Sequence, residues 1–203
     1  MSNEVKIAEL PFGLVARGAG AWSTDTGLRL SAAARTDLFC DPAVAETADP
    51  GDPVRLVGEV RGDFQLSARV EVDFRDTFDA GVLFLQLDED RWAKLCFEYT
   101  PQGEPSVVSV VTRGDSDDAN SQLVPVRHTW LRISRLGRAF AFHSSDDGEY
   151  WRMIRYFSLG ELSADVPVRV GFLAQAPHGE GCEATFSQIE FHQRTLAGLR
   201  DGS

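Results

Sequence analysis

Residues 64–74 read Phe-Gln-Leu-Ser-Ala-Arg-Val-Glu-Val-Asp-Phe, and apolar and polar side chains alternate along the whole stretch. Successive side chains of a β-strand point to opposite faces of a sheet, so this two-residue period predicts a strand with one buried face. Gly62-Asp63 before it and Arg75-Asp76-Thr77 after it are typical turn residues. The stretch therefore predicts a half-buried strand whose apolar side packs on a core.

The same kind of pattern continues on both sides of this strand. Residues 81–87 and 92–99 flank the acidic tip 88–90, which predicts a β-hairpin with its turn in water. Within 182–192 the apolar phase changes, and this predicts a β-bulge near Ser187-Gln188. Further strands are expected over 28–30, 106–112, 129–135, 138–143, 150–157 and 166–174.

No stretch between residues 60 and 195 repeats its apolar residues with the helical period, and turn signals recur at the spacing of sandwiches and barrels. A chain of 203 residues that is 43% hydrophobic suits one globular domain with a sizeable core. We therefore expect a single all-β domain over 1–203. Residues 1–60, including a loop over 41–53, are expected to form a loop-rich cover on the sandwich, and 197–203 to fray.

The formal net charge of −11 repels phosphate backbones and anionic lipid, so nucleic acid and membranes are not expected as partners. The sequence starts without a basic segment followed by a long apolar run, and no later stretch approaches the ~20 apolar residues of a spanning helix. Its three cysteines are far apart and form no C-x-x-C pair. These features predict a cytoplasmic protein.

An ordered series of short motifs runs along most of the chain. It comprises Thr36-Asp37-Leu38-Phe39, Gly62-Asp63-Phe64, Asp79-Ala80-Gly81, 88–94, Glu98-Tyr99, 110–113, Ser116-Asp117, Trp130-Leu131-Arg132, 145–148 and Trp151. Together these motifs resemble the regulation-of-enolase-like family of uncharacterised proteins. The resemblance implies a concanavalin A-like lectin/glucanase fold, in which two antiparallel sheets form a jelly-roll sandwich and one sheet has a concave face. It implies no established reaction, because a shared sandwich does not transfer function.

The strand over 92–99 is the best candidate for a ligand-binding surface. Its alternation assigns Ala93, Leu95, Phe97 and Tyr99 to the core and leaves Trp92, Lys94, Cys96 and Glu98 on the opposite face. A flat aromatic ring stacks on sugar C–H groups, and charged groups hydrogen-bond to hydroxyls, so this combination favours a carbohydrate site. The predicted ligand-binding residues are Gln86, Trp92, Lys94, Glu98 and Arg113, with Trp22 and Asp37 overhanging the concave face.

A plain solvated face is the alternative to such a site, because outward polar residues occur on any sandwich strand. Lys94 beside an acid is then an exposed pair worth ~0–1 kcal/mol, and Arg113 neutralises Asp115 and Asp117. Glu71 and Asp73 also look superficially like the acidic strand of laminarinase-type glycoside hydrolases. No tryptophan or methionine surrounds them, so chance acidic residues on an outer face explain them better.

Other catalytic and metal signatures are absent from the sequence. The acidic tracts 115–118 and 145–148 match no EF-hand loop, and the four histidines lack ligand spacing, so we expect no metal. No G-x-S-x-G elbow, P-loop or G-x-G-x-x-G occurs, which favours a binding protein over an enzyme and predicts no cofactor.

Three functions stay open on the sequence alone. The first is binding of a carbohydrate or small sugar-like ligand on the concave sheet. The second is an enzyme acting on a sugar or sugar acid, with Glu98 as acid or base. The third is a cytoplasmic protein-interaction or regulatory domain, with a partner protein or a second copy of the chain.

Overall fold

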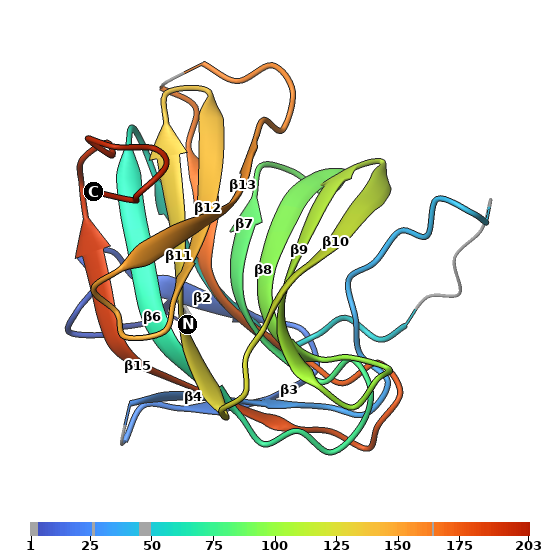
Figure 1. Ribbon diagram of the computed structural model, residues 1–203. Helices are drawn as coiled ribbons and strands as arrows, with labels where there is room; N and C mark the ends of the chain where they lie inside the picture. Colours follow the sequence, from blue (N-terminus) through green and yellow to red (C-terminus); the bar gives the residue numbers. More distant parts are fainter. Residues whose placement is uncertain (1–3, 26, 45–49, 164) are drawn as a thin grey trace.

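The computed structural model describes residues 4–25, 27–44, 50–163 and 165–203. All fifteen secondary-structure elements in these ranges are β-strands, which form two antiparallel sheets packed face to face (Figure 1). The predicted all-β sandwich is confirmed. The described ranges contain no helix that is long and apolar enough to cross a membrane. The start of the chain and the part of the predicted 41–53 loop at 45–49 lie outside the described residues.

One sheet has eight strands. In spatial order they are β1 (Glu4–Val5), β2 (Leu14–Arg17), β5 (Arg55–Val60), β14 (Val168–Gln175), β7 (Ala80–Gln86), β8 (Arg91–Tyr99), β9 (Pro105–Arg113) and β10 (Asp115–Leu123). In Figure 1, β8, β9 and β10 are bowed, with their hollow side turned away from the other sheet and toward the segment that follows β4.

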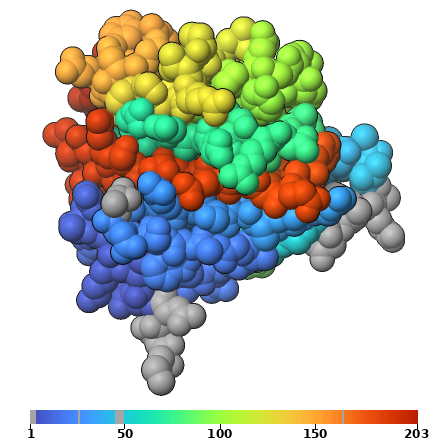
Figure 2. All heavy atoms as spheres, turned by 90° about the horizontal axis from the view of Figure 1, so that it is seen from below, coloured from blue at the N-terminus to red at the C-terminus, as the bar shows by residue number. Residues whose placement is uncertain are grey.

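The other sheet has seven strands. Their order is β13 (Trp151–Phe157), β12 (Ala139–Ser145), β11 (His128–Leu136), β6 (Phe64–Val72), β15 (Glu183–His192), β4 (Leu28–Ala32) and β3 (Gly20–Ser23). In Figure 2 the blue N-terminal residues lie beside the red residues near the C-terminal end of the chain, as the pairing of β4 with β15 requires.

The core lies between the two sheets, and β6 shows how the sequence builds it. Its alternate side chains Phe64, Leu66, Ala68, Val70 and Val72 are all buried in this core. Burial of such an aliphatic or aromatic side chain contributes about 1.5–3 kcal/mol. The strand predicted first from its alternation is therefore a central strand of the seven-stranded sheet.

The predicted β-bulge in the last strand is confirmed. The pairing register of β15 with β6 shifts between Ser187 and Glu190, and Gln188 has a φ of 47°. The extra residue moves the following apolar side chains back to the core side.

The first sixty residues are more regular than we expected. They supply β1, β2 and β5 to the eight-stranded sheet and β3 and β4 to the other. These short strands show little apolar alternation, so the sequence does not reveal them. In the folded chain, β4 pairs with β15 and β2 pairs with β5, which satisfies their backbone hydrogen-bonding groups. Among the described residues of this region, Leu38, Phe39 and Cys40, which follow β4, pack over the eight-stranded sheet as part of the expected cover.

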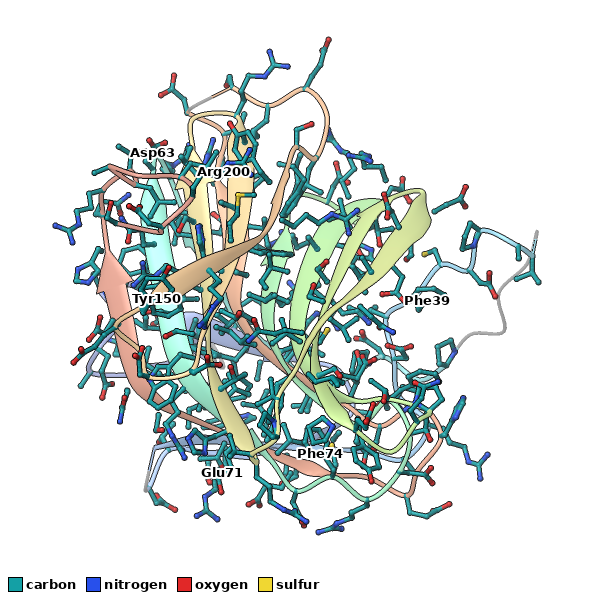
Figure 3. All side chains as sticks on the ribbon, viewed as in Figure 1. Phe39, Asp63, Glu71, Phe74, Tyr150 and Arg200 are labelled. Carbon is teal, nitrogen blue, oxygen red and sulfur yellow. The ribbon has the colours of Figure 1, made fainter. Side chains whose placement is uncertain are left out.

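The C-terminal residues 197–203, which we expected to fray, lie instead on the outer side of the seven-stranded sheet, where Figure 3 labels Arg200. The guanidinium of Arg132 donates a hydrogen bond to the carbonyl of Gly202 and stacks 3.7 Å from the ring centroid of Trp151. His143 Nε2 lies 2.8 Å from the carbonyl oxygen of Leu199. The tail thus supplies acceptors to polar groups that the sheet buries.

Substitution of Gly202 by alanine is expected to detach this tail. Gly202 has a left-handed φ of 69°, and an added Cβ would lie 2.9 Å from Trp151 Cβ. We expect a loss of about 1 kcal/mol in the free energy of unfolding and faster amide exchange at 197–203. Gly137→Ala is the matched control, because Gly137 has a similar φ of 61° with nothing within 4 Å of an added Cβ. Equal tail exchange in the two variants would contradict the docked tail.

Candidate functional site

The candidate site lies on the face of the eight-stranded sheet that is turned away from the seven-stranded sheet, called the outer face below. Along β8, Ala93, Leu95 and Phe97 join the core between the sheets, whereas Trp92 and Cys96 belong to a separate cluster. The alternation along β8 therefore predicted correctly which of these side chains face the core and which face outward.

The outer face is covered rather than solvated. Phe84, Trp92 and Val110 belong to its apolar cluster, against which the side chains of residues 38–40 pack. The backbone of Cys40 fixes this cover to β10, because its N–H donates to Ser116 Oγ and its carbonyl accepts from Ser116 N, both at 2.9 Å. Figure 3 shows Phe39 on this segment, beside β10.

A cavity of about 330 Å³ remains between the cover and the sheet, called the outer-face cavity below. It is lined by Asp37, Phe39, Asp41, Phe78, Lys94, Glu98, Val110, Asp118, Gln175, Pro177 and His178. Lys94 is 2% exposed and Glu98 is 8% exposed, so the solvated-face alternative does not hold for these two residues.

Strand pairing explains why these side chains converge. Lys94 is the cross-strand neighbour of Val110 on β9, which in turn is the neighbour of Asp118 on β10. Residues directly opposite each other in neighbouring strands present their side chains on the same face. Each row of the sheet therefore delivers side chains from distant parts of the sequence to one cavity.

A second row on the same face runs through Glu98, and the row of Cys96 lies between the two. The neighbour of Glu98 on β7 is Ala80, whose neighbour on β14 is Gln175. The small side chain of Ala80 leaves space between the carboxyl of Glu98 and the amide of Gln175. Two rows of one pleated face thus place a lysine, two carboxyls and an amide around the same cavity.

Lys94 is the centre of a buried polar network. Its Nζ donates hydrogen bonds to Asp37 Oδ1 at 3.0 Å and to Gln175 Oε1 at 2.9 Å. Gln175 Nε2 in turn donates to the carbonyl of Phe78 at 3.3 Å, and Asp37 Oδ1 accepts from Leu38 N at 2.7 Å. Burial is the largest single effect and lowers the pKa of Lys94, but the charge and hydrogen bond of Asp37, together with Cys96 and Glu98, outweigh it, so the pKa is raised and Lys94 stays charged.

Glu98 differs from Lys94 because its carboxyl has no hydrogen-bond partner among the described residues, although it is almost completely buried. The pKa of Glu98 is raised to about 8, mainly because burial disfavours the charged form; Lys94 opposes this effect, and the charges of Asp118 and Asp37 add to it. Glu98 is therefore largely protonated at neutral pH. A carboxyl that lacks a protein partner at the wall of a cavity indicates a place for a ligand.

Phe78 adds a strained backbone to the cavity wall. Its φ of 67° lies in the left-handed region, which costs a bulky residue about 1 kcal/mol or more. The strain persists because Phe78 N donates to the carbonyl of Tyr99 at 2.7 Å while its own carbonyl accepts from Gln175. The Phe78 ring meets His178 edge-on at 5.1 Å. Strain of this kind concentrates at functional sites.

The structure brings together Asp37, Lys94 and Glu98 from the residues that the sequence predicts for the site. Gln86 and Trp92 share the outer face as a cross-strand pair, but they do not line the cavity. Trp92 instead packs on Phe84 and lies 5.8 Å from Lys94 Nζ. Trp92 therefore lies beside the cavity wall without lining it.

Arg113 and Trp22 lie elsewhere. Arg113 is exposed at the end of β9 and donates to the carbonyl of Ser158 at 2.8 Å. Trp22 is an exposed residue of β3, which belongs to the seven-stranded sheet, so it does not overhang the outer face as predicted. The described part of the chain contains no group of three or more His, Cys, Asp or Glu residues that could hold a metal ion. Glu71 lies on the seven-stranded sheet and binds Arg69 at 2.9 Å.

Sequence reasoning missed several lining residues. Gln175 had a signal, because Phe172 and Ala174 face the core, so the positions that alternate with them, Leu173 and Gln175, belong to the outer face. Asp118 had none, since its acidic tract predicts a turn and not the edge strand β10. The others are Val110 on β9 and five residues in loops, which are Phe39, Asp41, Phe78, Pro177 and His178.

Comparisons with solved structures show the same fold. A functionally unknown protein from Saccharomyces cerevisiae is similar with a TM-score of 0.77 and 20% identity, over 88% of this chain and 95% of that one. A GH43 protein from Bacillus licheniformis is similar with a TM-score of 0.68 and 14% identity, over 94% of this chain but only 38% of that one. The carbohydrate-binding module CBM66 from Bacillus subtilis is similar with a TM-score of 0.50 and 12% identity, over 87% and 94%.

At such identities these likenesses establish the fold alone. No protein with curated function matches the sequence. Residues 18–194 match the family described as "Protein of unknown function (DUF1349)". Since this match spans most of the chain, the protein belongs to the DUF1349 family.

Proposed function

We propose that the outer-face cavity binds a carbohydrate or a small sugar-like ligand. The observation that carries the proposal is the Glu98 carboxyl, which is buried and unpartnered among the described residues and faces a cavity of about 330 Å³. Ligand pockets usually combine apolar walls with a few fixed polar groups. Here Phe39 and Phe78 provide aromatic walls, and the Lys94 network is fixed before any ligand arrives.

The fold relatives support a sugar over other small molecules. They include a carbohydrate-binding module, and GH43 proteins of which a portion matches this chain. We also propose that the chain falls within the narrower regulation-of-enolase-like group, which the ordered motifs from Thr36 to Trp151 favour.

Replacement of Glu98 by leucine tests the binding proposal. Leucine fills a similar volume without polar atoms, so the ligand-free protein should become more stable, because an unpartnered buried carboxyl is removed. Binding should weaken at least about tenfold, since a lost hydrogen bond in a buried site is worth about 1.4 kcal/mol or more. Calorimetric titration with a panel of monosaccharides and disaccharides, together with urea unfolding, measures both effects.

Glu71→Leu is the matched control, because Glu71 is an exposed glutamate on the other sheet. It should leave sugar affinity unchanged. Failure of every sugar to bind the wild-type protein at millimolar concentration would overturn the proposal, and so would equal affinity of the wild type and Glu98→Leu.

A second candidate function is an enzyme acting on a sugar or sugar acid. The specific observation in its favour is the raised pKa of Glu98, about 8, which keeps the carboxyl protonated at neutral pH as a general acid requires. Asp118 supplies a second carboxyl on the same cavity. Turnover of aryl glycosides that is lost in Glu98→Gln would favour this function over simple binding.

A further inference from the structure

The charges around the outer-face cavity are strongly unbalanced. Four carboxyls line it, from Asp37, Asp41, Glu98 and Asp118. Lys94 is the one lysine or arginine among its described lining residues, and His178 is exposed at the rim. Because Asp37 already neutralises Lys94 at 3.0 Å, the cavity keeps an excess of carboxyls.

A cation outside the cavity, Arg155, does not correct this excess. Arg155 on β13 is held by Asp117, with which it forms an ion pair at 2.8 Å, and it also donates to the carbonyl of Asp117. Asp117 and Asp118 are consecutive residues of β10, so they point to opposite faces of the strand. The carboxyl of Asp118 therefore remains available to the cavity.

We propose that the ligand of the outer-face cavity carries a protonated amine, as an amino sugar does. This inference rests on the proposed function and narrows its ligand class. The buried Glu98 carboxyl lacks a donor among the described residues, and an ammonium group is the donor that would complete it. Phe39 and Phe78 reinforce the choice, because aromatic rings attract cations.

Ligand binding in this scheme includes a proton step. Glu98 begins as a neutral carboxyl, and its burial favours that form. An incoming ammonium group stabilises the carboxylate, so the Glu98 proton passes to the solvent as the ion pair forms. The O–H bond of the Glu98 carboxyl breaks, water or a buffer base accepts the proton, and the charge of the bound ammonium group replaces the charge of the released proton.

An anionic ligand is expected to bind weakly in the outer-face cavity. Two of the three Lys94 protons are directed at Asp37 and Gln175, so a carboxylate would have to compete with Asp37 for the cation. It would also face Asp118 and Asp41 in a partly dry cavity, where like charges repel more strongly than in water. A uronic acid should therefore bind worst among sugars of similar size.

The test compares three matched sugars by calorimetric titration at neutral pH: glucosamine, N-acetylglucosamine and glucuronic acid. We expect glucosamine to bind at least about tenfold more tightly than N-acetylglucosamine, and glucuronic acid to bind most weakly. Repeating the titration in buffers of different ionisation enthalpy should reveal release of up to about one proton with glucosamine. Glu98→Gln should abolish this release, and Glu71→Gln should retain it.

A second series of probes separates this inference from the proposed function. It consists of ethanolamine, ethylene glycol and glycolate. Like the three sugars, these compounds are a cation, a neutral molecule and an anion, but they have no sugar ring. If sugars bind without a preference for the amine, the inference is overturned and the sugar-binding function stands. If no sugar binds but ethanolamine binds with proton release, the amine inference stands and the sugar-binding function falls. If neither series favours the amine, the inference is overturned.

Discussion

Glu98→Gln is expected to remove a loss of stability that the wild-type protein shows as the pH rises from about 4.5 to about 8. Burial raises the pKa of Glu98 from 4.5 to about 8 in the folded protein. In this range the folded state keeps the proton and the unfolded state has lost it, so stability falls as pH increases. The slope for one group is about 1.4 kcal/mol per pH unit. Glutamine cannot ionise, and the variant should be a few kcal/mol more stable than the wild type near pH 8.

Urea unfolding of both proteins across this range measures the difference. His143 contributes the opposite sign, because burial lowers its pKa and stability is lost as the pH falls. Since His143 is present in both proteins, its effect cancels in the difference between the two curves. The exposed substitution Glu71→Gln should give a curve parallel to the wild type. If the curve of Glu98→Gln were also parallel to the wild type, Glu98 would not be the buried, protonated group described above.

The sandwich could be predicted because its strands carry local signals. The alternation of 64–74 and the phase change near Ser187-Gln188 each describe one strand and its own two faces. Side-chain direction in a strand follows from the backbone alone, so these patterns survive folding unchanged. For the same reason, the alternation of β8 is enough to assign Lys94 and Glu98 to one face of the sheet.

β10 is a strand that its own sequence does not predict. Its sequence, Asp-Ser-Asp-Asp-Ala-Asn-Ser-Gln-Leu, has little β-propensity and resembles a turn. The strand forms because β9 offers a long edge with which it pairs, and because Ser116 binds Thr112 and Cys40 by hydrogen bonds. Such support depends on residues that only the tertiary structure brings near.

The burial of the site could not be predicted from the sequence for the same reason. An exposed sheet face and a covered one have identical alternation, so the sequence left the solvated-face alternative open. The cover comes from residues 38–40, and the partner of Lys94 comes from Gln175, 81 positions later. The left-handed backbone of Phe78 also has no sequence signal, because phenylalanine is a poor choice for that conformation.

Lys94→Met is expected to be the most destabilising substitution at the site. It removes the cation and leaves the carboxylate of Asp37, whose side chain is 17% exposed, without its partner. Breaking a buried ion pair in this way typically costs about 3–5 kcal/mol. Arg91→Met is the matched control on the same strand, because Arg91 pairs with Asp88 in a more exposed ion pair. That change should cost far less stability than Lys94→Met in the same urea unfolding experiment, because water screens an exposed ion pair.

A double substitution distinguishes the ion pair from simple packing. Asp37→Asn removes the charge but keeps an oxygen that can accept from Leu38 N, so adding it to Lys94→Met leaves no buried charge. The double variant should therefore recover part of the stability lost in Lys94→Met. Recovery should be incomplete, because Gln175 Oε1 still lacks the donor that Lys94 supplied. If the double variant were less stable than Lys94→Met by the full cost of Asp37→Asn alone, the two residues would act independently, and the network that shapes the cavity would not be an ion pair.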